Sequence, residues 1–141
     1  MSNDYKCMIK DTYLTLLKNN AKMASDNFFT ITHMNDFNKA IFKLIKKDIN
    51  KKFLHIASNE VITRIKFANL IIKYSKNKKK MFYKKCKFKE INYSEKRAAK
   101  NNLNGELTNK ILKIKFTKVE KTIKQKVKIL DKAYSKLKKI I

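Results

Sequence analysis

The chain has 141 residues, enough for one domain, and 43% of them are hydrophobic, which excludes wholesale disorder. One glycine and no proline leave few tight turns, so the composition favours helices over a sheet fold. The formal net charge is +25, since 36 Lys and Arg residues stand against 11 Asp and Glu. A charge excess of this size repels itself unless a polyanion neutralises it. Nucleic acid is therefore the first candidate partner and an anionic membrane surface the second.

The first part of the chain predicts a short helix followed by a long one. Residues 4–18 carry apolar side chains at helical spacing, and residues 23–26 are typical of a loop. Asn27 is placed to cap a long amphipathic helix that runs to about residue 57 and is roughly 40 Å long. A face of that length needs crossing helices or a partner to cover it. The face consists of Ile31, Met34, Phe37, Ile41, Ile45, Ile49, Phe53 and Ile56.

Three further helical segments are predicted after the long helix. Residues 64–74 form the first, with Thr63 as its N-cap, and residues 81–93 form the second, in which aromatic side chains serve packing. Residues 101–105, which include the only glycine, break the chain, and residues 106–141 then form a basic amphipathic helix. This last helix can fold back on the domain, pair as a coiled coil or lie on an anionic surface, and docking on protein is the preferred interpretation.

The order of these helices and one local motif resemble the histone fold. The segment Met34-Asn35-Asp36-Phe37, followed by Ile41-Phe42 and Ile45, resembles the MNxFxxxIFxxI pattern in the central helix of histone 2B. The predicted helix 81–93 corresponds to the extra C-terminal helix of that family. The supporting positions are His55 and Ile62-Thr63, which keep the family's spacing if one extra residue is allowed, and Leu16-Leu17-Lys18, which stands where the family has Val-Leu-Lys.

The predicted fold class is therefore all-α. It is a histone fold (short helix, loop, long helix, loop, short helix) with a C-terminal helix and a further basic amphipathic helix. The predicted domains are residues 1–94, the histone-fold domain with its 2B-like helix, and residues 95–141, a basic helical extension. The resemblance implies a head-to-tail dimer that binds the DNA backbone without reading its sequence. Ser58-Asn59-Glu60 replaces the family's Lys-Arg in the second loop, which weakens one minor-groove contact.

The function that the resemblance implies is DNA compaction in a nucleosome-like particle. The chain would be an obligate hetero-oligomer with a histone 2A-like partner and the other core histones on double-stranded DNA. It would be located in the nucleus and chromatin, or in the virion and viral factory if viral. The apolar face of the long helix, Ile31 to Ile56, is the predicted dimer interface. The predicted DNA-binding residues are Lys6, Lys10, Lys18, Lys22, Asn27, Ser58, Asn59, Arg64 and Lys66.

The sequence shows no pattern that indicates catalysis. Its two histidines and two cysteines form no nucleophile–base pair and no metal-ligand spacing, and there is no glycine-rich phosphate loop. We therefore predict no enzyme, no catalytic residue, no metal site and no cofactor. The alternative function is a Lys-rich helical protein bound to RNA or the ribosome, and a third, weaker alternative is attachment of the 106–141 helix to a membrane surface.

Overall fold

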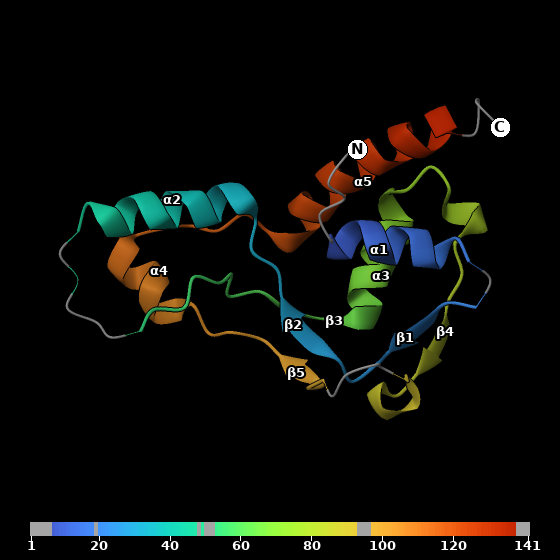
Figure 1. The fold of residues 1–141 in the computed structure, drawn as a ribbon, viewed down its shortest axis with the longest axis horizontal. Helices are drawn as coiled ribbons and strands as arrows, with labels where there is room; N and C mark the ends of the chain where they lie inside the picture. Colours follow the sequence, from blue (N-terminus) through green and yellow to red (C-terminus); the bar gives the residue numbers. More distant parts are fainter. Residues whose placement is uncertain (1–6, 19, 48, 50–52, 93–96, 138–141) are drawn as a thin grey trace.

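The fold of the chain is a mixture of α-helices and β-strands, seen in a computed structural model that describes residues 7–18, 20–47, 49, 53–92 and 97–137 (Figure 1). The helices are α1 (Met8–Leu16), α2 (Met34–Ile45), α3 (Arg64–Tyr74), α4 (Glu106–Leu112) and α5 (Val119–Leu137), with short 3-10 turns η1 (Lys78–Lys80) and η2 (Phe88–Glu90). The strands are β1 (Lys22–Ala24), β2 (Phe28–Thr30), β3 (Val61–Thr63), β4 (Lys84–Cys86) and β5 (Lys100–Asn101). The predicted all-α histone fold is therefore wrong.

Two small sheets connect segments that are distant in the sequence. Strand β1 pairs in parallel with β4, so that Met23 lies opposite Lys85. Strand β2 lies in the middle of the second sheet, antiparallel to β3 and parallel to β5. The aromatic pair Phe28-Phe29 in β2 is typical of strands, because large side chains pack well on a pleated surface.

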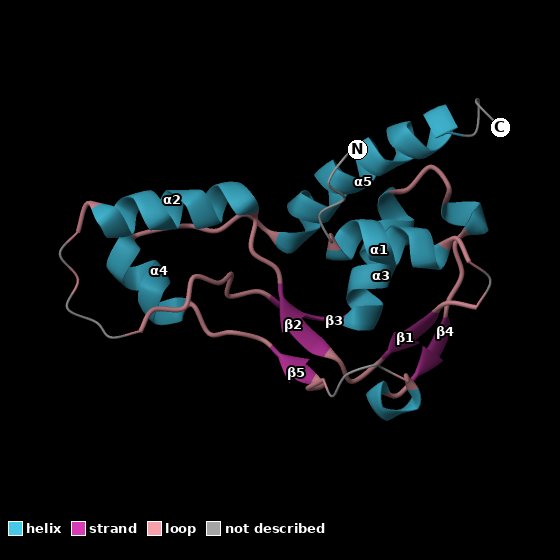
Figure 2. Cartoon of the chain, viewed as in Figure 1, coloured by secondary structure: helices cyan, strands magenta, loops and turns pink. Residues whose placement is uncertain are grey.

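The hydrophobic core lies where α1, α3 and α5 pack together beside the sheets (Figure 2). Each helix supplies fully buried side chains to it, and together they exclude water from one continuous cluster. Helix α5 begins where the Glu60 carboxylate accepts a 2.8 Å hydrogen bond from the Val119 N–H, a favourable position for an acid at a helix N-terminus. The fully buried side chains that these helices contribute include Tyr13, Leu16, Phe67, Ile71, Ile123 and Val127.

Helices α2 and α4 lie together at the opposite end of the molecule from the α1–α3–α5 core (Figure 1). The Lys43 Nζ donates to the carbonyl oxygens of Leu112 at 2.9 Å and of Lys113 at 3.1 Å, and the Lys47 Nζ donates to that of Ile111 at 2.9 Å. These carbonyls end α4, where cations are favoured by the helix dipole and by the unpaired oxygens. The two lysines therefore fix one side of α2 on α4.

The predicted long helix over residues 27–57 is wrong, because the segment divides into strand, helix and irregular chain. Residues 28–30 form β2, helix α2 ends at Ile45, and residues 53–58 belong to neither a helix nor a strand. The prediction rested on apolar residues that continue at helical spacing through the whole segment. In the structure, however, the backbone of β2 is hydrogen-bonded to β3 and β5 instead of to the next turn of a helix. No crossed-helix dimer of the predicted kind can be built on a helix this short.

Of the later predicted helices, one is confirmed, one is wrong and one is interrupted. Helix α3 is confirmed from 64 to 74, and the Thr63 side chain accepts a hydrogen bond from the Lys66 N–H as its N-cap. The predicted helix 81–93 is wrong, since β4 and η2 occupy its described part. The predicted helix 106–141 is interrupted between α4 and α5, where Lys113 adopts the left-handed conformation (φ 48°) that ends α4.

The division of the chain between residues 94 and 95 stays a prediction. Across it, β5 pairs with β2, and α5 packs against α1 and α3. Within the described residues, none of the helices is long and apolar enough to cross a lipid bilayer.

Candidate ligand-binding sites

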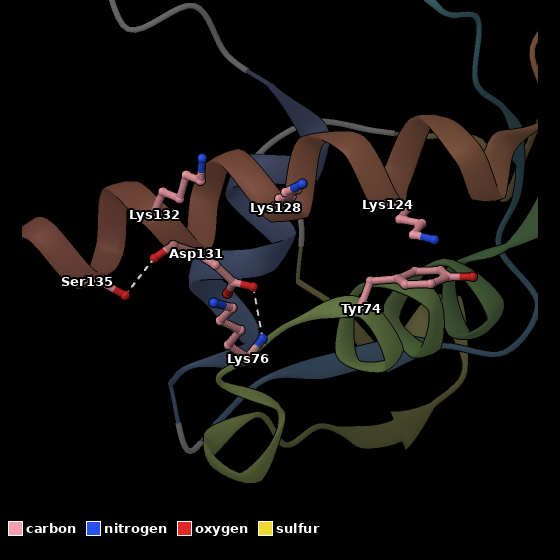
Figure 3. Close-up of a pocket in the computed structure, with 7 residues that line it drawn as sticks. All are labelled: Tyr74, Lys76, Lys124, Lys128, Asp131, Lys132 and Ser135. Atoms are coloured by element: carbon pink, nitrogen blue, oxygen red, sulfur yellow. Dashed lines mark hydrogen bonds between the residues drawn. The ribbon is translucent and has the colours of Figure 1, made fainter.

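The larger of two candidate sites lies between α3 and α5 and is surrounded by lysines (Figure 3). It has a volume of about 590 Å³. Three of its lysines stand one helical turn apart on α5, so that their ammonium groups share one side of the helix. We call it the lysine pocket, and define it by Tyr74, Lys76, Lys124, Lys128, Asp131, Lys132 and Ser135.

Asp131 is the one acidic residue of the lysine pocket, and its carboxylate is occupied by neighbouring donors. It accepts from Tyr13 at 2.7 Å, from Ser75 at 2.8 Å, from the Lys76 N–H at 2.8 Å and from Asn77 at 3.1 Å. Burial acts to raise the pKa of Asp131, but these hydrogen bonds outweigh it and hold the pKa below its usual value. Burial, and then the bond to Asp131, raises the pKa of Tyr13 to about 12.

Tyr74 forms the aromatic wall of the lysine pocket. Its hydroxyl donates to the carboxylate of Glu120, which also forms a 2.9 Å ion pair with Lys73. The ammonium groups of Lys73 and Lys124 lie 5.1 and 5.6 Å from the centroid of the ring. The pocket is thus positively charged, but its one carboxylate is already engaged by hydrogen bonds from the protein.

The second candidate site is a smaller hollow of about 200 Å³ between α1, β1 and α3. It offers two cations, two hydroxyl groups and one carboxylate, so that charged groups and hydrogen-bonding groups line one hollow. We call it the Arg64 hollow. Its lining residues are Asp11, Thr12, Thr15, Lys22, Met23, Arg64 and Ile91.

Arg64 is held in position by Asn27 and by Phe29 of β2. Its Nε donates a 3.2 Å hydrogen bond to Oδ1 of Asn27, and its guanidinium lies 4.7 Å from the centroid of the Phe29 ring. Asn27 is buried, and its Nδ2 donates at 2.8 Å to the carbonyl of Ala99, just before β5. A guanidinium fixed in this way loses less conformational entropy when it binds an anion than a free lysine does.

The predicted DNA-binding residues divide between the Arg64 hollow and structural roles. Lys22 and Arg64 line the hollow, Asn27 supports Arg64, and Lys10, Lys18 and Lys66 lie nearby in sequence on or beside α1 and α3. Ser58 is buried, and its Oγ accepts from the Glu60 N–H. The Asn59 side chain accepts from Asn109 at 2.7 Å. Lys6 lies outside the described residues.

Sequence reasoning did not select the α1 residues that complete the hollow. The sequence gives no sign that sets Asp11, Thr12 and Thr15 apart from other helix positions. Nothing local links them to Arg64, which lies about fifty positions later. The only signal was the cluster of cations near the ends of the first and third predicted helices. That signal indicated an anionic ligand, and it gave no indication of the hydroxyl and carboxylate groups that α1 contributes to the hollow.

The predicted dimer-interface residues are only partly exposed. Met34, Phe37 and Ile45 expose large apolar area on α2, whereas Ile31, Ile41, Ile49 and Ile56 are half-buried. Phe53 is exposed beyond the end of α2. These residues do not form one helical stripe, because only four of the eight lie within α2 and the other four lie outside it.

The fold is that of a mixed α/β domain with two candidate ligand-binding sites. The model of the RmlD substrate binding domain family matches residues 4–132, and the chain belongs to this family. No curated protein sequence matches the chain.

Two solved structures share the fold. A dTDP-4-dehydrorhamnose reductase from Clostridium acetobutylicum superposes with a TM-score of 0.72 at 18% identity, over 90% of this chain and 45% of that one. The dTDP-4-dehydrorhamnose reductase from Bacillus anthracis, solved in complex with NADP, gives 0.66 at 16% identity, over 86% and 42%. The chain therefore spans less than half the length of these reductases.

Family membership overturns the histone interpretation, together with the function, the partners and the location inferred from it. The chain is not a histone 2B-type protein, and neither DNA compaction nor the RNA- or ribosome-associated alternative is supported. The predicted partners (DNA, a histone 2A-like chain and other core histones) and the nuclear or viral-chromatin location are wrong for the same reason. The prediction that the chain is no enzyme is also wrong, because the family to which it belongs is enzyme-like. The MNxFxxxIF run resembled a histone helix because any amphipathic helix repeats apolar residues at threes and fours.

Proposed function

We propose that this chain binds a nucleotide-linked sugar as the substrate-binding part of an RmlD-like reductase. The family is described as a substrate-binding domain, and the two similar structures are reductases of a dTDP-linked sugar. A ligand of that class carries a diphosphate, a flat base and several hydroxyl groups. Its recognition needs cations and hydrogen-bond acceptors at one place.

The Arg64 hollow is the observation that carries this proposal. Arg64 and Lys22 would bind the phosphate groups, since both are cations on the same hollow. Thr12, Thr15 and Asp11 on α1 would bind sugar hydroxyls, with the carboxylate as acceptor. The lysine pocket is larger, but it presents ammonium groups and a carboxylate that the protein itself has saturated.

The hydride of such a reduction has to come from a cofactor bound elsewhere. NADP is the cofactor in the Bacillus anthracis structure. Dinucleotide-binding loops use several closely spaced glycines to let the pyrophosphate approach the backbone, and the 141 residues contain one glycine. The residues of this chain would therefore bind and orient the sugar-nucleotide, while the redox chemistry would take place against a separate cofactor-binding unit.

Isothermal titration calorimetry with dTDP-rhamnose, with dTDP as a second ligand, tests the proposal. We expect saturable binding by the full chain, and a loss of affinity of about ten-fold in R64Q and in K22Q, because each removes one charge-assisted hydrogen bond. K128Q removes the same charge from the lysine pocket and is the matched control, which should bind normally. Loss of binding in K128Q with normal binding in R64Q would move the site to the lysine pocket. Absence of binding of either ligand to the unmodified chain would refute the function.

A further inference from the structure

The lysine pocket concentrates positive charge that no acidic side chain pairs with in the described part of the chain. Lys124, Lys128 and Lys132 follow one another at intervals of four residues along α5 (Figure 3). Lys76 adds a fourth ammonium group from the turn after α3. All four side chains are exposed, and the described ion pairs include none of them. Like charges one helical turn apart repel each other, so an anion bound between them would stabilise this arrangement.

The two carboxylates beside the pocket are already engaged by the protein. Asp131 is only 3% exposed, and its four hydrogen-bond donors all come from the chain itself. Glu120 pairs with Lys73 and accepts from the Tyr74 hydroxyl. The lining of the cavity therefore presents four ammonium groups against one occupied carboxylate, and its charge is positive.

The cavity is large enough for a small ligand, and hydrogen bonds fix its walls. Its volume of about 590 Å³ lies within the range of about 300–1,000 Å³ that is usual for ligand sites. The Tyr74 ring is anchored through its hydroxyl on Glu120, and the Lys124 ammonium stands 5.6 Å from the centroid of the ring. The Lys76 N–H donates to Asp131 at 2.8 Å, which holds the turn after α3 against α5.

The chemistry of these groups selects the ligand. The ammonium group of lysine is a compact charge that suits phosphate oxygens. Lysines four residues apart are separated by about 6 Å along a helix, so the three on α5 extend over about 12 Å, and a chain of linked phosphates can contact them together. The Ser135 hydroxyl already donates to the Asp131 carbonyl, so the pocket offers charge where the Arg64 hollow adds hydroxyl groups. We propose that the lysine pocket is a second anion site, which binds an oligophosphate of three or more linked phosphate groups.

Calorimetric titration of the full chain with inorganic triphosphate tests this site. We expect saturable binding, and a loss of affinity of about ten-fold in K128Q, which removes one charge-assisted contact. K39Q removes the same charge from an exposed position on α2, distant from the pocket, and should change the affinity by less than about two-fold because of solvent screening. An equal loss in the two variants would show that net charge alone attracts the ligand, and would overturn the proposal. Absence of saturable binding to the unmodified chain would overturn it as well.

Thermal melting provides a second readout. Triphosphate should raise the melting temperature of the unmodified chain, because it binds the folded state, and sodium chloride at equal ionic strength should not reproduce the rise. The rise should be smaller in K128Q and unchanged in K39Q. An equal rise in K128Q and in the unmodified chain would contradict binding in the lysine pocket.

The same titrations separate this inference from the proposed function, since the two sites share no lining residue. We expect R64Q to bind triphosphate normally. Loss of triphosphate binding in R64Q with normal binding in K128Q would place the phosphate chain in the Arg64 hollow and overturn the second site. A chain that binds triphosphate through Lys128 but binds no dTDP-rhamnose would refute the proposed function and support the second site.

Parallel titration with ATP identifies the source of the phosphate chain. Tighter binding of ATP than of inorganic triphosphate would indicate a nucleotide whose base packs on Tyr74, and equal or weaker binding would indicate a free chain. Both results support the site if K128Q weakens them, because both ligands are recognised through the same lysines.

Discussion

The hydroxyl of Tyr13 donates a 2.7 Å hydrogen bond to Oδ1 of Asp131, joining α1 to α5 across 118 positions of the sequence. Both residues are buried, and Asn77 donates to the two of them, to the Tyr13 oxygen at 2.9 Å and to Asp131 at 3.1 Å. Ser75 and the Lys76 N–H complete the arrangement. The cluster joins α1 and α5 to the C-terminal end of α3. A buried carboxylate of this kind is stable only while its donors remain.

Tyr13→Phe should lower the free energy of unfolding by about 1–3 kcal/mol, because it removes a donor from a buried charged acceptor and an acceptor from Asn77. Chemical denaturation followed by circular dichroism measures the change. Tyr83→Phe is the matched control, since the Tyr83 hydroxyl donates to Asn69 at 2.8 Å on the exposed surface. Equal effects of the two substitutions would show that the buried cluster adds nothing specific.

Stability should fall in acid because of Asp131. Its pKa is lowered in the folded chain, so the charged carboxylate stabilises the fold above its ordinary pKa of about 3.9, and this stabilisation is lost as the pH falls through the lower folded value. The pKa values of Glu106 and Glu120 are also lowered, but both carboxylates are exposed and contribute little. Thermal melting from about pH 6 to about pH 2 should show the loss. Asp131→Asn should be less stable at pH 6 and should show a shallower acid dependence. An unchanged dependence in that variant would exclude Asp131 as the cause.

Gly105→Ala should destabilise the protein by about 1–3 kcal/mol through overpacking. A Cβ at this position would fall against the backbone carbonyl of Ala57, and Ala57 is itself buried. Either the chain around Ala57 or the start of α4 would therefore have to move. The melting temperature measures the effect. Ala98→Val, which adds methyl groups at an exposed position, should leave it nearly unchanged. A melting temperature equal to that of the unmodified chain would show that this close approach is relaxed in solution.

Arg64→Lys should weaken dTDP-rhamnose binding about ten-fold although the charge is kept. Lysine cannot reproduce the Nε bond to Asn27 together with the contact on the Phe29 ring, so the cation is no longer held over the hollow. Calorimetry at two salt concentrations measures both the affinity and its salt dependence, and the latter should change little. Lys66→Arg, on the same helix but exposed, is the control and should bind normally. Normal binding by Arg64→Lys would show that charge alone is sufficient at this position.

The sequence by itself determined those features that depend on neighbours along the chain. Helix α3 and its Thr63 cap followed from local apolar spacing and one hydroxyl. The apolar side of α2 was recognised from residues three and four positions apart, although the helix was predicted too long. The cationic character near Lys22 and Arg64 was also evident, and it indicated an anionic ligand.

Only the tertiary structure decided the fold class and the composition of the sites. Strands of two or three residues carry too few positions to show a period of two. Strand β2 forms because β3 and β5, whose paired residues lie from 31 to 72 positions away in the sequence, supply its hydrogen bonds. The Arg64 hollow requires α1, β1 and α3 to meet, and the carboxylate of Asp131 requires donors from α1 and from the end of α3. Contacts between residues so far apart leave no local pattern, so periodicity alone favoured a continuous helix where the chain forms a sheet.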